Sequence, residues 1–164
     1  MNEIQSRIKT VFNQQLANSQ NIRNTTFKER SAKLKSIETW LMDHKEDIRN
    51  AMHQDYRKPA SEVDITELWA ALNEIRHIRR YLKKWMQSKK VKSTLTMATA
   101  EAWIQYEPKG VVLIITPWNF PFNLTISPLI AAIAAGNCAI IKPSELTPNS
   151  SKVIAKMVND LFKE

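Results

Sequence analysis

The chain has 164 residues, of which 24 are Lys or Arg and 16 are Asp or Glu, giving a formal net charge of +8. Hydrophobic residues make up 43% of the sequence, too many for a disordered chain, and the length suits a single domain. No apolar run reaches the roughly 20 residues that span a bilayer, and the charged N-terminus lacks the apolar core of a signal peptide. The single cysteine excludes an intramolecular disulfide and a multi-cysteine zinc site. These features predict a soluble protein of the reducing cytoplasm.

Residues 1–92 are predicted to be helical throughout. The second helix begins at Thr26, where Thr26-Phe27-Lys28-Glu29 has the spacing of a capping box. Pro59 interrupts the third helix, and a long fourth helix begins at Ser61 or Glu62. Apolar residues at helical spacing form a stripe on each helix: Ile4, Ile8, Val11, Phe12 and Leu16; Phe27, Leu34, Ile37 and Leu41, with Trp40 at the margin; Ile48, Ala51 and Met52; and Ile65, Leu68, Trp69, Leu72, Ile75, Ile78, Leu82 and Trp85. The five tryptophans are mostly at stripe positions and are assigned to the core.

The excess positive charge is concentrated at the end of the long helix. Residues 1–92 hold 19 basic and 11 acidic side chains, whereas residues 93–164 hold 5 of each. The window 76–92 has no acidic residue and eight basic ones: Arg76, Arg79, Arg80, Lys83, Lys84, Lys89, Lys90 and Lys92. Such a face could make the chain an anion-binding module for nucleic acid, an acidic membrane or a cofactor. We favour a solvated helix face, because the basic residues of 76–84 lie mostly off the apolar stripe.

The second part of the chain alternates strands and helices. Residues 93–107 mix Thr with apolar and aromatic residues and predict one or two exposed strands. The apolar, mostly β-branched run 111–115 is typical of a parallel strand covered on both faces, and 138–142 is a second short strand. Helices are predicted from about 124 to 135, ended by Gly136 at the C′ position, and from Ser150 or Ser151 onward. This order predicts an α/β fold in which N-terminal helices precede the first half of a doubly wound, Rossmann-like parallel sheet.

Two loops leave the carboxyl ends of these strands, where ligands bind in an open parallel sheet. In the first loop, Asn119 offers an amide NH2 suited to a developing oxyanion, although such an Asn can instead satisfy its own turn. In the second, Glu145 can accept hydrogen bonds from a ribose diol and Lys142 can bind hydroxyl or phosphate oxygens. The alternative for Lys142 and Glu145 is a surface ion pair. The sequence has no GxGxxG or GxxxxGK[ST] motif, and its histidines (His44, His53 and His77) lack metal-ligand spacing, so no metal site is predicted.

Several spaced motifs surround these loops: Glu107-Pro108-x-Gly110, Thr116-Pro117-Trp118-Asn119-Phe120-Pro121, Pro128, Ala132-Ile133-Ala134-Ala135-Gly136-Asn137 and Lys142-Pro143-Ser144-Glu145-x-Thr147-Pro148. In this order they resemble the aldehyde dehydrogenase superfamily. The helical part agrees, because Arg30, Leu34, Asp55, Lys58-Pro59 and Glu67 resemble the family's N-terminal pattern. The stretch from Asn73-Glu74-Ile75 to Trp85 resembles most the class 3, fatty-aldehyde-type branch. The resemblance extends from about residue 20 to the end of the chain.

The resemblance implies NAD(P)-dependent oxidation of an aldehyde to a carboxylic acid, by a homo-oligomer when the protein is full length. Asn119 matches the family asparagine that helps to stabilise the oxyanion. Lys142 and Glu145 match positions that hold the adenosine ribose of NAD or NADP. Neighbouring positions along the cofactor cleft are matched by Thr116, Pro117, Trp118 and Ser144. The implied partner is a small-molecule aldehyde, with no nucleic acid and no membrane span.

The same resemblance implies that the chain is the N-terminal third of such an enzyme. The family reaction needs a cysteine nucleophile and a glutamate that activates water, and in the family both lie beyond residue 164. Cys138 stands at the start of a strand, where a small buried hydrophobe is expected. The predicted organisation is a helical part of the cofactor domain (1–92), an exposed strand segment that could contact other subunits (93–107) and a βαβα half of the NAD(P)-binding domain (108–164), with the catalytic domain absent. We therefore expect the chain to be inactive alone; the alternative is a truncated chain that associates with full-length subunits.

Overall fold

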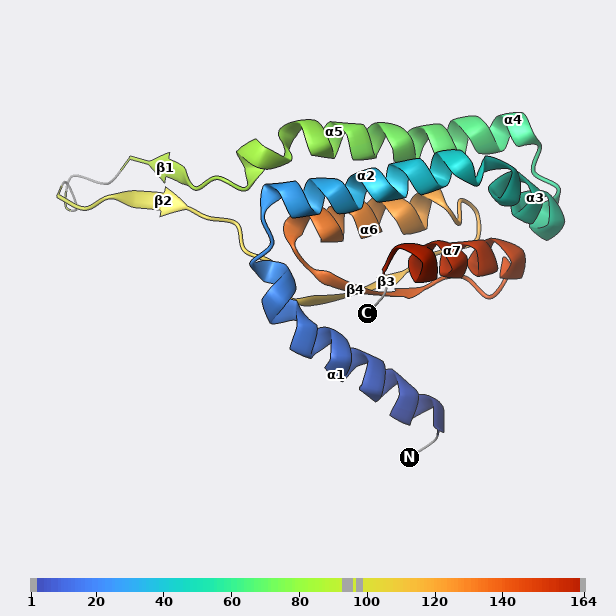
Figure 1. The fold of residues 1–164 in the computed structure, drawn as a ribbon, viewed down its shortest axis with the longest axis horizontal. Helices are drawn as coiled ribbons and strands as arrows, with labels where there is room; N and C mark the ends of the chain where they lie inside the picture. Colours follow the sequence, from blue (N-terminus) through green and yellow to red (C-terminus); the bar gives the residue numbers. More distant parts are fainter. Residues whose placement is uncertain (1–2, 93–95, 97–98, 163–164) are drawn as a thin grey trace.

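The computed structural model describes residues 3–92, 96 and 99–162, and Figure 1 shows their arrangement. The first part of the chain forms α1 (Glu3–Arg23), α2 (Phe27–Asp43), α3 (Lys45–Tyr56), α4 (Ala60–Val63), the π-helical turn η1 (Asp64–Trp69) and α5 (Ala70–Trp85). The second part forms β1 (Lys89–Val91), β2 (Ala102–Ile104), β3 (Val111–Ile115), α6 (Asn123–Ala135), β4 (Cys138–Lys142) and α7 (Pro148–Leu161). Helix α6 lies between α5 and the parallel strands, and α2 packs beside α6 under α5.

The parallel sheet confirms the predicted α/β class. Strands β3 and β4 pair in parallel over their full length, from Val111 opposite Cys138 to Ile115 opposite Lys142. Helix α6 is the crossover between them and contacts both strands. It ends at Gly136, whose φ of 82° lies in the left-handed region, as predicted for a C′ glycine.

Strand β3 is not covered on both faces, contrary to the prediction from its apolar run. Ile114 is buried in the main core cluster, whereas Leu113 and Ile115 have exposed fractions of 62% and 67%. Side chains alternate between the two faces of a strand. Of the residues that the structure describes, those of α6 cover only the face of Ile114, and the contact of α1 with the strands leaves the opposite positions open.

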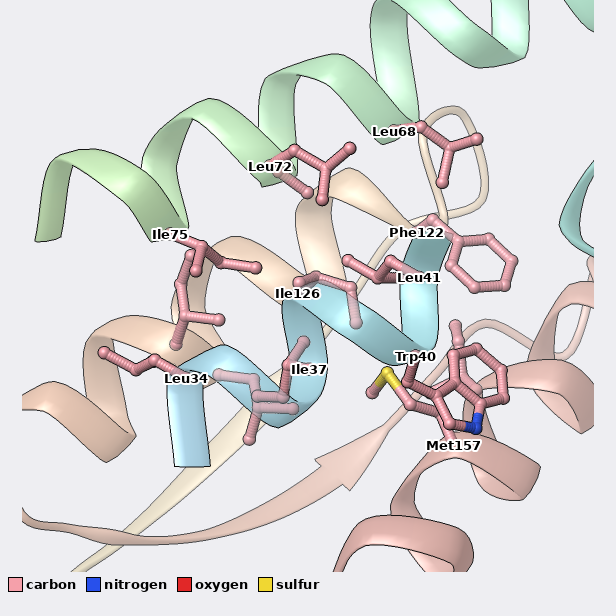
Figure 2. Packing of buried hydrophobic residues seen from close by; sticks show 14 of the residues in the cluster. Leu34, Ile37, Trp40, Leu41, Leu68, Leu72, Ile75, Phe122, Ile126 and Met157 are labelled. Atoms are coloured by element: carbon pink, nitrogen blue, oxygen red, sulfur yellow. The ribbon is translucent and has the colours of Figure 1, made fainter. Parts of the chain in front are cut away.

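Helix α2 supplies the centre of the core and begins at the predicted capping box. The Thr26 hydroxyl oxygen accepts a hydrogen bond from the Glu29 N–H (3.3 Å), and the Glu29 carboxylate accepts one from the Thr26 N–H (2.6 Å). Three residues of the predicted stripe, Leu34, Ile37 and Leu41, are buried, whereas Phe27 is only partly buried. Figure 2 shows the buried side chains packed among those of neighbouring elements: Leu68, Leu72, Ile75, Phe122, Ile126 and Met157.

Trp40 lies inside this core and not at its margin. It is 5% exposed, its indole N–H donates to Asp160 Oδ2 of α7 (2.9 Å), and its ring stacks on His44 with centroids 3.9 Å apart. The carboxylate from α7 satisfies the polar atom of the indole, which allows the whole side chain to be buried.

The long predicted helix is interrupted by η1, and this changes which residues it buries. Ile65 and Trp69 belong to the predicted stripe but are 64% and 63% exposed, whereas Leu68 and Leu72 are buried. A π turn holds one residue more than an α turn, so residues within it fall out of step with the stripe of α5. The other three tryptophans are also exposed: Trp85 lies at the end of α5, Trp103 in the hairpin and Trp118 in a loop. The assignment of the tryptophans to the core is therefore correct only for Trp40.

Helix α1 carries its predicted apolar stripe on an exposed surface. Ile4, Ile8, Phe12 and Leu16 are all exposed, and in Figure 1 the helix extends away from the body of the molecule. Its C-terminal half lines a cavity of about 610 Å³ together with residues of α6, β4 and α7.

A two-stranded antiparallel hairpin projects from the body of the molecule (Figure 1). Strand β1 pairs with β2, with Lys89 opposite Ile104 and Val91 opposite Ala102. Residues 89–91 were expected to be helical, but α5 ends at Trp85 and pairing with β2 satisfies the backbone of β1. The predicted exposed strand segment 93–107 contains β2; its residues 93–95 and 97–98 lie outside the described part of the chain.

Candidate cofactor and oxyanion site

The two loops predicted to carry the site leave the same edge of the sheet. The Thr116 N–H donates to the Lys142 carbonyl oxygen (3.1 Å), extending the ladder of β3 and β4 by one hydrogen bond. Residues 116–121 and 142–145 therefore begin side by side, as parallel strands require.

In the first loop, the side chains divide between the interior and the surface. Thr116 is buried, and its hydroxyl lies 3.1 Å from that of Thr125, which donates to the Pro121 carbonyl oxygen (2.6 Å). Asn119 is exposed, as are Pro117 and Trp118. Within the described residues, no group hydrogen bonds to the Asn119 side chain, so its amide is available to donate to a ligand and does not cap its own turn.

In the second loop, Lys142 and Glu145 form an exposed ion pair. Lys142 Nζ lies 2.6 Å from Glu145 Oε2, and this hydrogen bond lowers the pKa of the Glu145 carboxyl. The pair lines a shallow depression at the end of β4 with Pro143, Ser144, Pro148 and Ser151. At this point of the surface the carboxylate can accept hydrogen bonds from sugar hydroxyl groups, and the ammonium can donate hydrogen bonds to their oxygens.

Ser144 is a structural residue of this loop. It is buried; its hydroxyl accepts from the Leu146 N–H (3.2 Å) and its carbonyl oxygen accepts from the Ser151 hydroxyl (3.0 Å). The last helix begins at Pro148, two or three residues before the predicted start at Ser150 or Ser151, and Ser150 is a buried residue of its first turn. Ser144 therefore shapes the loop from within, whereas the side chains of Lys142 and Glu145 face solvent.

A buried ion pair beneath the first loop escaped the sequence analysis. Lys58 Nζ lies 2.9 Å from Glu67 Oε1, with both side chains almost fully buried, and Glu67 Oε2 accepts from the Asn123 N–H (2.8 Å). Burial raises the pKa of Glu67, although the hydrogen bonds from Asn123 and Lys58 act in the opposite direction. Lys58 Nζ also lies 4.2 Å from the centroid of the Phe120 ring. The family-like pattern Lys58-Pro59…Glu67 was the available signal, but it did not reveal this contact.

A second carboxylate supports the other loop. Asp55 Oδ1 accepts from the N–H and side-chain amide of Asn149 (3.0 and 2.9 Å), and Oδ2 accepts from the N–H and hydroxyl of Ser150 (2.8 and 2.7 Å). Burial alone would raise the pKa of Asp55, but these hydrogen bonds from Ser150 and Asn149 lower it overall. Asp55 thus caps the N-terminus of α7 from a different helix.

The Gly136-Asn137 motif has a packing role. Arg30 is buried and donates to the carbonyl oxygens of Ala134 and Arg23, each at 3.0 Å. A Cβ atom at Gly136 would lie only 2.5 Å from Arg30 Nη2, and glycine avoids this clash because it has no Cβ. Asn137 Oδ1 accepts from the Gly110 N–H (2.9 Å), joining the turns before β3 and β4.

Two further predictions concern Cys138 and the basic window. Cys138 is buried, as predicted, and burial raises the pKa of its thiol, which disfavours the nucleophilic thiolate. Buried Glu38 binds Arg76 (2.8 Å) and Arg79 (3.2 Å), so part of the basic face is used within the chain. Burial would raise the pKa of Glu38, but the hydrogen bonds from Arg76 and Lys35 lower it overall.

The described residues contain no helix long and apolar enough to cross a membrane. In the same part of the chain, no three His, Cys, Asp or Glu side chains are grouped so that they could hold a metal ion.

The parallel strands, the crossover helix and the two adjacent loops define half of an open α/β sheet of the class that binds ligands at the carboxyl ends of its strands. Comparison with known proteins specifies the family. The sequence model of the aldehyde dehydrogenase family matches residues 4–161, and the chain belongs to that family. It is 41% identical over 129 residues to aldehyde dehydrogenase family 3 member B1 of Bos taurus, a match that covers 79% of this chain and 28% of that protein. This similarity supports the predicted class 3 branch.

Solved structures of aldehyde dehydrogenases also match the chain over almost its whole length. The substrate-bound state of Staphylococcus aureus AldH matches with a TM-score of 0.91 at 38% identity, over 99% of this chain and 35% of that one. The succinic semialdehyde dehydrogenase of Streptococcus pyogenes in complex with NADP+ matches with a TM-score of 0.84 at 18% identity, over 96% and 34%, which shows a shared fold. The chain thus spans about a third of the length of the relatives it matches.

Proposed function

We propose that this chain provides the oxyanion donor and the ribose-binding edge of an NAD(P)-dependent aldehyde dehydrogenase, which oxidises an aldehyde to a carboxylic acid. The observation that carries the proposal is the hydrogen bond between Thr116 and Lys142, because it joins the loop of Asn119 to that of Lys142 and Glu145. One loop offers a neutral amide donor and the other an acceptor–donor pair, at one edge of the sheet.

Asn119 is proposed to donate its side-chain amide to the oxygen of the aldehyde as negative charge develops there. A neutral donor stabilises that charge without competing for a proton, and removing one such donor typically lowers kcat by about 10²–10³-fold. The exposed, unbonded state of this amide within the described structure supports the role.

Lys142 and Glu145 are proposed to hold the adenosine ribose, and exposed Pro117 and Trp118 to form the neighbouring wall of the cofactor cleft. Buried Thr116 and Ser144 are proposed to contribute to the cleft by shaping the two loops from within. The donor set fits a sugar, because Glu145 accepts from hydroxyl groups and Lys142 donates to their oxygens. When bound, the nicotinamide cofactor supplies the hydride acceptor of the oxidation. The carboxylate of Glu145 favours a free 2′-hydroxyl, whereas Lys142 can offset the charge of a 2′-phosphate, so both NAD and NADP are candidates.

Calorimetric titration of the 164-residue chain with NAD+ and, separately, NADP+ tests this assignment. The variant Lys142→Ala/Glu145→Ala is expected to bind at least about tenfold more weakly, as for the loss of a hydrogen bond to a charged group. The matched control is Lys90→Ala/Glu101→Ala, which removes an equally exposed ion pair from the hairpin and leaves affinity unchanged. Equal affinities in all three proteins, or no binding to the unaltered chain, would refute the proposal.

The same proposal predicts that residues 1–164 alone do not oxidise aldehydes. Their single cysteine is the buried Cys138, which cannot serve as the nucleophile that the family reaction requires. NAD(P)-dependent oxidation of an aldehyde by the purified chain would contradict this. A cytoplasmic location belongs to the proposal as well and is checked by fractionation of cells that express the protein.

The hairpin supports a second candidate function, association with full-length subunits of the family. Trp103, Ile104 and Tyr106 are exposed on or beside β2, which projects from the body of the molecule. Such apolar exposure on an edge strand is typical of a contact surface. Size-exclusion chromatography with a full-length homologue should show co-elution that Trp103→Ser abolishes; separate elution would exclude it. The basic window is a weaker candidate, because Glu38 engages Arg76 and Arg79.

A further inference from the structure

The segment 55–67 extends from the end of α3 into η1. It contacts the first loop at Phe120 and the starts of α6 and α7, the helices that follow the two loops. We infer that it is a positioning element in which Glu67 fixes the loop that presents Asn119 and Asp55 fixes the loop that presents Lys142 and Glu145. The role of the loops rests on the proposed function, whereas the contacts that hold them do not. Asp55 and Glu67 would then be positioning residues that act through other groups and do not themselves touch a ligand.

Glu67 holds the first loop through the start of α6. Each of its two carboxylate oxygens faces a donor, Lys58 Nζ on one side and the Asn123 N–H on the other. Because the side chain is fully buried, neither contact can be replaced by solvent. Lys58 reaches the same loop a second time, over the ring of Phe120, which directly follows Asn119. The pair therefore holds the loop at two points, Phe120 and Asn123, both on the C-terminal side of Asn119.

Asp55 holds the second loop through the start of α7. Its four hydrogen bonds to Asn149 and Ser150 fix the first turn of that helix. The next residue, Ser151, donates to the carbonyl oxygen of Ser144, which lies between Lys142 and Glu145 in the sequence. The Asp55 carboxylate is thus connected to the loop of the ion pair through the first turn of α7 and the hydrogen bond from Ser151 to Ser144.

The local backbone explains how one short segment serves two loops. Helix α3 ends at Arg57, whose φ of 60° lies in the left-handed region. This turn separates Asp55, at the end of α3, from Lys58, which is directed toward η1. A buried ion pair adds little net stability compared with apolar residues of the same size, so the arrangement is better explained by the geometry it imposes than by stability.

The isosteric variants Glu67→Gln and Asp55→Asn test the inference, because each amide retains only one acceptor oxygen where the carboxylate has two. Hydrogen–deuterium exchange of the 164-residue chain is measured over peptides that contain 117–124 and 143–151. Glu67→Gln is expected to speed exchange roughly 10- to 100-fold in the first peptide only, and Asp55→Asn in the second only, as for the loss of one hydrogen bond to a charged group. Matched controls are Glu62→Gln, whose half-exposed carboxylate lies 3.7 Å from Lys58, and Asp47→Asn, which removes the negative charge from a surface ion pair between α3 and α7.

Equal acceleration in both peptides, or none in either, would overturn the inference, since a merely stabilising role affects the whole chain alike. If Glu67→Gln does not fold, Lys58→Met/Glu67→Leu replaces the pair with apolar residues and still removes the acceptor for Asn123. Asp55→Asn should also weaken NAD+ binding about tenfold, while Asp47→Asn should not. Loop-specific exchange in a chain that binds neither NAD+ nor NADP+ would confirm the positioning and refute the proposed function, so the two failures are distinguishable.

Discussion

The substitution Gly136→Ala tests the close packing of Arg30 against Gly136. Gly136 has a φ of 82°, and a Cβ atom there would lie 2.5, 2.6 and 2.8 Å from Nη2, Cζ and Nη1 of Arg30. The left-handed conformation costs an alanine about 1–2 kcal/mol. The guanidinium must also move, losing at least one buried hydrogen bond to Ala134 or Arg23 worth about 1.5–3 kcal/mol. We expect a loss of about 2.5–5 kcal/mol in the free energy of unfolding, a large part of the stability of such a chain.

Urea unfolding followed by circular dichroism measures this loss, and Gly110→Ala is the matched control. Gly110 also has a positive φ, of 108°, but its added Cβ would meet only Ser19 Oγ at 4.0 Å. This control should therefore lose only the strain of the backbone. The double variant Gly136→Ala/Arg30→Ala should be less destabilised than the sum of its single variants, because the clash is absent. Equal losses for the two glycine variants, or strict additivity in the double variant, would refute the reasoning.

Three further outcomes are expected. The pKa of Asp55 is lower in the folded chain than the value of about 4 that it has in the unfolded chain, so its stabilising effect is complete above about pH 4 and is lost as the pH falls through the folded pKa. The free energy of unfolding should therefore fall between about pH 5 and pH 2, and it should fall less in the variant Asp55→Asn. Trp40→Phe removes the hydrogen bond to Asp160 and part of a buried ring, so it should lower the free energy of unfolding by about 1–3 kcal/mol, whereas the exposed Trp103→Phe should change it by less than about 0.5 kcal/mol; similar losses would contradict the burial of Trp40. Cys138 should react with a thiol reagent at least about 100-fold more slowly in the folded chain than in urea, and fast labelling of the native chain would show that β4 opens readily.

Features encoded over a few neighbouring residues could be predicted from the sequence. The capping box at Thr26, the buried stripe of α2 and the C′ glycine after α6 follow from local spacing, and the structure confirms all three. The adjacency of Thr116 and Lys142 was also predictable, because two consecutive parallel strands end at one edge of a sheet.

The remaining features depend on partners that are distant in the sequence. Asp55 binds residues more than 90 positions away, and Glu67 binds the N–H of Asn123, so periodicity carries no trace of either contact. The exposure of Trp69 follows from one additional residue in a helical turn, which a search for regular spacing does not detect. Strand β1 was missed because its conformation is stabilised by pairing with β2 and not by local propensity.

The π turn η1 changes how this region tolerates a change in chain length. A turn with one residue more than the α-helix is equivalent to an insertion that the fold has accommodated. Deleting one residue from it would let the helix become regular and leave the residues on either side in register, because the turn absorbs the extra residue. A deletion within the regular turns of α5 would not be absorbed and would rotate the residues before it by about 100° relative to those after it. The number of residues is therefore less constrained within η1 than in the regular helix that follows it.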